Sequence, residues 1–255
     1  MNATHSACGQ DKSLEWPLDS VSLQRNSNNR RPTIVHCIEA MPSTMALLQQ
    51  AVQVTRWPMH LTHAVVGKTE GGTVLFPNAA AGAEQYGVFS CQQDAAAAAT
   101  TGSDSVPCVP VPQRTLDSLA PKLLSSSTQQ STLMIDYLSI DTEGHDWRVL
   151  EGAHHTLRYY TKYVEFEYHA VGVWSQTNLS QAIEFMASLQ YVCYWAGHEQ
   201  LWRITDCGSR MYDSSDFKAW SNVACVHVER ASLLAERMEK VFLQTLSMPI
   251  KKERT

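Results

Sequence analysis

The amino-acid sequence predicts an α/β fold built on a doubly wound, mostly parallel sheet. The apolar, β-branched run Thr33–Ile38 is followed by helical spacing of apolar residues over Pro42–Val54 and by a second strand-like run, Leu61–Val66. A strand, a helix and a strand in this order favour parallel pairing with a crossover helix. The pattern recurs where a buried strand predicted over Met134–Ile140 is followed by a helix that begins at Asp146.

The rest of the chain continues this alternation. Tyr163–Tyr168 alternates apolar and polar residues as a strand does, and Ser180–Leu189 places apolar residues at helical spacing. Further elements are predicted as strands over 191–195, 201–204 and 222–228 and as a helix over 234–245. We expect polar tails at 1–31 and 247–255, and a surface insertion at 91–113, where an Ala/Thr run is followed by three prolines.

Composition argues against several classes of protein. The 255 residues carry 25 acidic and 20 basic side chains, a net charge of -5, which argues against a general nucleic-acid binder. No apolar run approaches the ~18 residues of a membrane span, and no secretory h-region opens the chain. The seven cysteines are odd in number and never spaced C-x-x-C. We therefore expect buried thiols in a reducing compartment, by default the cytoplasm, and neither a disulfide framework nor a zinc site.

Glu39 is a candidate binding residue because it ends the first predicted strand. Ligands of doubly wound sheets bind outside the carboxyl ends of the strands, and a carboxylate there can accept hydrogen bonds from both hydroxyls of a ribose. The alternative is that Glu39 is a favourable negative charge before the N-terminus of the following helix. Its position in the sequence gives the two interpretations equal weight.

A second acidic cluster, Asp141–Asp146, follows the most apolar predicted strand. In extended geometry Asp141 and Glu143 point the same way, so one carboxylate could orient a substrate while the other takes a proton. Gly144 permits a tight turn or a close approach of the backbone to a ligand. No known metal-ligand motif matches the cluster, so no metal is expected. The alternative is that Asp146 caps the next helix and Asp141 binds neighbouring backbone.

A third polar group lies on the strand predicted over Tyr163–Tyr168 and at its end. Glu165 and Glu167 share one face of that strand, and His169 follows it. His169 is a candidate general base because the ordinary histidine pKa lies near working pH, although a histidine here is more often a loop residue. Asn222, which opens a late strand, is a weaker candidate for hydrogen bonding to a substrate.

Four segments, in order over about residues 33–170, resemble the FkbM-type methyltransferases. The strongest is LSIDTEGHDWRVLEGAHHTL with the following YVEFEY, which is similar to the family pattern L-K-I-D-x-E-G-x-E-x-x-V-L-x-G-A. The others are CIEAMPSTMALL, HAVVGKTEGG and VPVPQRTLDSL. Ser139 stands where the family usually has Lys, and Ala40 replaces the usual first Pro after the acid.

The resemblance implies a class I, Rossmann-like methyltransferase domain over 32–246 that uses S-adenosylmethionine, usually to methylate a hydroxyl oxygen. It implies that Glu39 binds the cofactor ribose and that Asp141 and Glu143 lie beside the methyl donor. The expected sites are therefore a cofactor site of Glu39, Ala40, Asp141, Thr142, Glu143 and Gly144, and a catalytic set of Asp141, Glu143 and His169. The expected acceptor is a small molecule, a sugar or a lipid, in a pocket shaped by the variable segments 78–113 and 170–222.

One departure from the family lies near the start of the chain. No glycine occurs between Gly9 and Gly67, whereas the family has a glycine-rich loop after its first strand, some 20–30 residues before the segment that contains Glu39. The first strand is therefore expected to be missing or degenerate. Two interpretations follow: a methyltransferase with a truncated N-terminal part, or an inactive, methyltransferase-like binding module. A nicotinamide-dependent oxidoreductase is a weaker third option, because it needs the same glycine loop.

Overall fold

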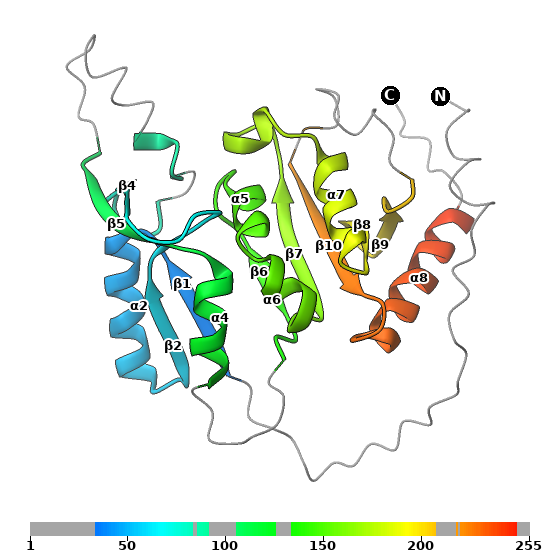
Figure 1. Ribbon diagram of the computed structural model, residues 1–255, viewed down its shortest axis with the longest axis horizontal. Helices are drawn as coiled ribbons and strands as arrows, with labels where there is room; N and C mark the ends of the chain where they lie inside the picture. The colour runs from blue at the N-terminus through cyan, green and yellow to red at the C-terminus, as the bar shows by residue number, and fades with distance from the viewer. Residues whose placement is uncertain are drawn as a thin grey trace.

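The computed structural model describes residues 34–83, 86–91, 106–125, 134–207, 218 and 220–248 as a mixed α/β protein (Figure 1). The strands are β1 (Val35–Glu39), β2 (Met59–His63), β3 (Val65–Val66), β4 (Thr73–Pro77), β5 (Cys108–Arg114), β6 (Leu138–Ile140), β7 (Tyr163–Tyr168), β8 (Tyr191–Gly197), β9 (Gln200–Arg203) and β10 (Ser221–His227). The helices are α2 (Pro42–Thr55), α4 (Leu116–Ser125), α5 (Asp146–Glu151), α6 (His154–Tyr159), α7 (Leu179–Ser188) and α8 (Ser232–Ser247), with a 3-10 turn η1 (Gly172–Ser175).

The largest sheet among the described residues has the strand order β6-β7-β10-β8-β9 and is mixed. β6 and β7 are parallel, as expected for strands joined through the helices α5 and α6. β10 is antiparallel to both β7 and β8, and β8 is antiparallel to β9. The expectation of one mostly parallel, doubly wound sheet is therefore corrected: β8 and β9 are joined by a tight turn, which permits only antiparallel pairing.

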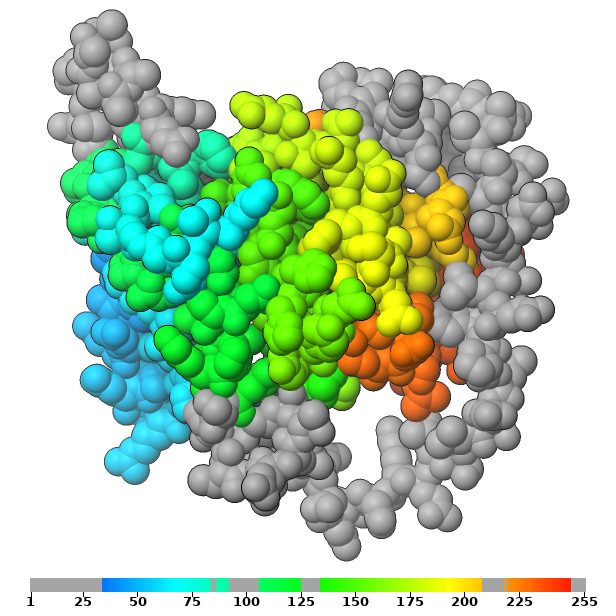
Figure 2. All heavy atoms as spheres, viewed as in Figure 1, coloured from blue at the N-terminus to red at the C-terminus, as the bar shows by residue number. Residues whose placement is uncertain are grey.

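Helices cover both faces of this sheet (Figure 1). Alternate residues of β7 and β10, such as Phe166 and Val223, pack with Leu150, Leu157 and Met186 of the helices α5, α6 and α7. The intervening residues of β8 and β10 face α8. Their cluster on that face is Val192, Tyr194, Ala224, Val226, Ala235, Met238 and Phe242. Figure 2 shows that the early elements, blue to green, and the late elements, yellow to red, occupy opposite sides of the molecule.

Two smaller sheets lie in the early part of the chain. β1 and β2 pair in parallel, and β3, β5 and β4 form a sheet in the order β3-β5-β4. β5 includes the proline-rich segment CVPVP, and Val111 within it is fully buried. This part of the expected surface insertion at 91–113 is thus a partly buried strand paired with β4, because Pro110 and Pro112 alternate with Val109 and Val111, which pack in or against the core cluster there. Residues 92–105 of that insertion, and most of both predicted tails, lie outside the described residues.

The parallel pair β1–β2 and the five-stranded sheet are separate sheets within the described residues. There β1 pairs only with β2, and β6 pairs only with β7, so each has one edge without a partner strand. No residue of β1 is fully buried, although Ile38 packs against the main core. The segment in which the family's first strand would lie is outside the described residues, so the expectation that this strand is missing or degenerate stays a prediction.

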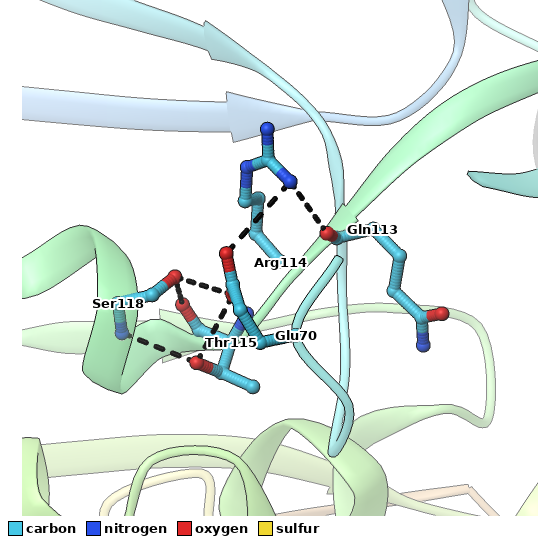
Figure 3. Close-up of polar contacts among 5 residues, drawn as sticks. All are labelled: Glu70, Gln113, Arg114, Thr115 and Ser118. Carbon is cyan, nitrogen blue, oxygen red and sulfur yellow. Dashed lines mark hydrogen bonds and ion pairs between the residues drawn. The ribbon is translucent and has the colours of Figure 1, made fainter. Parts of the chain in front are cut away.

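The loop before β4 is fastened to the start of α4 by Glu70 (Figure 3). One carboxylate oxygen of Glu70 accepts hydrogen bonds from the Ser118 hydroxyl at 2.6 Å and from the backbone N–H of Thr115 at 2.8 Å. The Thr115 hydroxyl in turn accepts the backbone N–H of Ser118, which caps the helix. Arg114 lies 3.7 Å from the other carboxylate oxygen. This contact joins two segments that are more than forty residues apart in the chain.

Two disulfides overturn the expectation of thiols for four of the seven cysteines, whereas Cys37 is a free thiol as expected. Cys91 is bonded to Cys108, and Cys193 is bonded to Cys225. The second pair occupies directly opposed positions of the antiparallel strands β8 and β10. Neither pairing follows a recognisable sequence spacing, because tertiary structure brings the partners together. Among the described residues, no helix combines the length and apolar character that crossing a membrane requires.

Candidate functional site

A cavity of about 350 Å³ lies at the carboxyl ends of β1 and β6. Its lining brings together five residues that the sequence predicts as binding or catalytic: Glu39, Ala40, Asp141, Thr142 and Glu143. They come from segments about a hundred residues apart. The volume falls within the usual range for small-molecule sites. Gly144 and His169 do not line the cavity.

Glu39 is the last residue of β1, and hydrogen bonds to its side chain and to its backbone carbonyl hold it in place. The backbone N–H of Met41 donates to Glu39 Oε1 at 2.6 Å, and the Glu39 carbonyl accepts the N–H of Ala64 at 3.1 Å. The His63 ring is hydrogen-bonded through Nε2 to the Ala40 carbonyl at 3.0 Å. These bonds fix the chain between β1 and α2, where the carboxylate lines the cavity.

One wall of the cavity is apolar and aromatic. Val65, Phe76, Tyr86 and Val88 line it, and Val65, Phe76 and Val88 belong to the core cluster around β3, β4 and β5. The cavity therefore combines an apolar side with the three carboxylates of Glu39, Asp141 and Glu143. Such a combination suits a ligand with a flat apolar ring and hydroxyl or cationic groups.

The loop after β6 turns sharply at Glu143 and Gly144. Both residues have positive φ, 51° and 86°, and the turn is closed by a hydrogen bond from the His145 N–H to the Thr142 carbonyl at 3.2 Å. A Cβ on Gly144 would lie 2.6 Å from the carbonyl oxygen of Val171. Glycine is thus required here, and the close approach ties the loop to the start of η1.

His145 is a cavity residue outside the set predicted from the sequence. It lines the cavity, and burial, with the nearby charge of Arg148, lowers its pKa to about 4. The imidazole is therefore neutral at working pH. Its place within the predicted acidic cluster was the available signal, but the sequence pattern alone left its role open.

Asp146 is fully buried and does not cap the following helix with its side chain. Its Oδ1 accepts the backbone N–H of Glu167 at 3.4 Å, which links the loop to β7. Burial raises the pKa of Asp146 to about 7. The alternative interpretation, in which Asp146 caps the helix, is therefore wrong, because the side chain bonds β7 instead.

His169 lies apart from the cavity, beneath Trp220. Its side chain is 1% exposed, and its ring stacks on the indole with centroids 4.3 Å apart and planes at 10°. His169 Nδ1 accepts the backbone N–H of Val171 at 3.2 Å, so the neutral ring carries its proton on Nε2. Burial lowers the pKa of His169, which favours this neutral form. In that form Nε2 is a hydrogen-bond donor and has no lone pair with which to take a proton.

The negative charge of Asp141 acts on Glu167 and His169, the polar residues at the end of β7. Asp141, which lines the cavity, raises the pKa of both Glu167 and His169 through its charge, although burial is the larger effect on each. The strand register agrees with this: Ile140, the residue before Asp141, is the partner of Phe166, so Asp141 follows β6 beside the end of β7. Among the described residues, no group of three or more histidine, cysteine or carboxylate side chains is arranged to hold a metal ion.

The sequence profile of the methyltransferase FkbM domain matches residues 19–193, more than half of the chain. The chain belongs to the FkbM methyltransferase family. The matched span includes Glu39 and the loop Asp141–Asp146, and it ends before β9, β10 and α8. No curated protein and no solved structure matches the chain. The family assignment therefore covers the cavity, whereas Trp220 and Asn222 lie outside the matched segment.

Proposed function

We propose that the chain is an S-adenosylmethionine-dependent O-methyltransferase whose cofactor binds in the cavity between β1 and β6. The observation that carries the proposal is the convergence of Glu39 with Asp141, Thr142 and Glu143 on one cavity in a chain of the FkbM methyltransferase family. The cofactor would supply a methyl group already activated by its bond to a sulfonium sulfur.

The residues of the cavity suit the parts of this cofactor. Glu39 would accept hydrogen bonds from the ribose hydroxyls, and its bond from the Met41 N–H keeps the carboxylate in one orientation. Phe76 and Val65 offer an apolar surface for the adenine ring. Asp141 and Glu143 would place negative charge near the sulfonium, and the backbone at Ala40, Thr142 and Gly144 would complete the binding surface.

The protein's part in the transfer is to align the acceptor and receive one proton. A hydroxyl oxygen must approach the methyl carbon in line with the breaking carbon–sulfur bond. Asp141 and Glu143 are the proposed groups that orient the hydroxyl and accept its proton. His169, expected from the sequence as a general base, has its Nδ1 lone pair engaged by Val171 and is better suited to donate from Nε2.

Isothermal titration calorimetry with S-adenosylmethionine tests the proposal. We expect micromolar binding to the full chain, and Glu39→Gln should weaken it about tenfold or more through loss of a charge-assisted hydrogen bond. Glu184→Gln, on the exposed side of α7, is the matched control and should bind as the unaltered chain does. Absence of heat at millimolar cofactor would instead support the inactive binding module.

Methyl transfer to an acceptor tests the proposed catalytic residue. Asp141→Asn should lower turnover at least about a hundredfold if Asp141 receives the proton, while thermal stability changes little because Asp141 is exposed. Unchanged turnover would remove Asp141 from the mechanism and leave Glu143 as the acceptor of the proton.

A further inference from the structure

The end of β7 and the start of β10 carry a second group of polar and aromatic side chains. Trp220 precedes β10, and Asn222 within it is the register partner of Glu167 on β7. Residues 220 and 222 are two positions apart, which places their side chains on one face of an extended chain. Glu167, Trp220 and Asn222 are thus neighbours at one end of the five-stranded sheet.

Two contacts fix the orientation of the Trp220 indole, one on a face of the ring and one at its N–H. His169 stacks on one face at 4.3 Å, and the indole N–H donates to Glu167 Oε1 at 3.0 Å. Trp220 is nevertheless 55% exposed. A large aromatic ring that is fixed in orientation and open to solvent can bind an apolar ring face with little loss of conformational entropy.

Beneath the indole, two buried polar atoms face one another without a hydrogen-bond partner among the described residues. They are Glu167 Oε2 and His169 Nε2, 4.0 Å apart. Because Nε2 carries the proton, His169 presents a donor to the carboxylate of Glu167. At 4.0 Å this pair is too far apart for a direct hydrogen bond, so Oε1 is held by the Trp220 indole while Oε2 and Nε2 stay available to a ligand hydroxyl.

The chemistry around Trp220 selects the class of ligand. Sugars pair the C–H face of a pyranose ring with an aromatic plane, and bind their hydroxyls to planar carboxylate and carboxamide groups; here Trp220, Glu167 and Asn222 provide both. Burial raises the pKa of Glu167 against the opposing hydrogen bond from Trp220, and the nearby charges of Asp141 and Glu143 raise it further. Accumulated negative charge disfavours phosphorylated or carboxylated ligands.

We propose that Trp220, Glu167 and Asn222 form the acceptor subsite and that this subsite takes an uncharged sugar ring. The inference rests on the proposed function, because Asp141, which lines the cavity of the proposed methyl donor, follows β6 beside β7, the strand that carries Glu167. The pyranose ring stacks on the open face of Trp220, and its hydroxyls bond Glu167 and Asn222. A hydroxyl of the bound sugar is the proposed methyl acceptor.

Saturation-transfer difference NMR with the full chain tests the subsite. The probes are the neutral methyl glycosides of glucose, mannose and rhamnose, with glucuronate and glucose 6-phosphate as anionic counterparts. At least one neutral glycoside should receive saturation on its ring C–H face, and the anionic sugars should bind at least about tenfold more weakly. Saturation of none of the neutral glycosides, or equal binding of the anionic ones, would overturn the proposal.

Variants locate the binding. Trp220→Ala should weaken glycoside binding about tenfold, while Trp220→Phe retains a stacking ring and should lose less. Glu167→Gln and Asn222→Ala should also weaken it. The controls are Trp57→Ala, which removes another exposed indole (67% exposed), and Glu165→Gln, on the same strand face as Glu167. Equal losses in Trp57→Ala and Trp220→Ala would contradict the assignment. Circular dichroism identifies any variant that fails to fold.

Cofactor titration separates the two proposals. If glycosides bind through Trp220 but S-adenosylmethionine gives no heat, the sugar site is supported and the proposed methyltransferase function is contradicted. If the cofactor binds and methyl groups are transferred only to acceptors other than sugars, the proposed function is supported and the sugar subsite is contradicted.

Discussion

Cys193 and Cys225 form a disulfide across the middle of the five-stranded sheet, with Cα atoms 4.0 Å apart and both residues fully buried. The two cysteines face one another in the register of β8 and β10, and 32 residues separate them in the chain. A covalent link of this kind restricts the unfolded chain, and loop-closure entropy gives a stabilisation of about 3–4 kcal/mol for a loop of this length.

The first prediction concerns this bond. The double substitution Cys193→Ala/Cys225→Ala should lower the free energy of unfolding in urea by about 3–4 kcal/mol. Cys91→Ala/Cys108→Ala opens a shorter loop, of 17 residues, and should cost about 3 kcal/mol. Mass spectrometry after alkylation in denaturing urea without a reductant should find all four cysteines unmodified, because a disulfide does not react. Alkylation of all four under these conditions would contradict both disulfides.

The sequence predicted what local patterns determine and missed what tertiary structure brings together. Glu39 and the loop after β6 were found because each follows a short apolar run, and strand ends converge in any sheet of this kind. The Cys193–Cys225 bond and the contact of His169 with Trp220 were missed. They depend on β10 lying antiparallel between β7 and β8, a register that residue spacing within one segment does not reveal.

The second prediction concerns Gly144, at the turn of the candidate active-site loop. Gly144→Ala should destabilise the fold by about 3 kcal/mol, because the residue has φ of 86° and the new methyl group would lie 2.6 Å from the Val171 carbonyl oxygen. Gly72→Ala is the matched control: φ is 74° but no atom lies within 4 Å of the added Cβ, so about 1 kcal/mol is expected. Equal decreases in the free energy of unfolding for the two variants would show that the close contact with Val171 does not add to the cost of Gly144→Ala.

The third prediction concerns Glu70, which fastens the loop before β4 to α4 (Figure 3). Hydrogen bonds from Ser118 and Thr115 hold the pKa of Glu70 below its ordinary value. The carboxylate therefore stabilises the fold at neutral pH, and this contribution is lost as pH falls through the lowered pKa. Glu70→Gln should lower the melting temperature slightly at pH 7 and not at pH 2. Glu229→Gln, at an exposed position, is the control and should leave the melting temperature unchanged at both pH values. If Glu70→Gln lowers the melting temperature equally at pH 2, the stabilisation comes from the packing of the Glu70 side chain and not from its charge.

The fourth prediction concerns the buried carboxyl of Asp146. Because burial raises its pKa from 3.8 to about 7, the folded state holds a proton that the unfolded state releases near pH 4. Folding stability should therefore fall as pH rises from about 4 to about 7, by up to roughly 4 kcal/mol from this residue. Asp146→Asn removes the ionisation, so its stability relative to the unaltered chain should increase over that interval and level off above it. Urea unfolding from pH 4 to 8 measures the difference.

Asp136→Asn, at an exposed position, is the control and should show no comparable change in stability with pH. A constant difference between Asp146→Asn and the unaltered chain at every pH would mean that Asp146 ionises in the folded protein as readily as in the unfolded one.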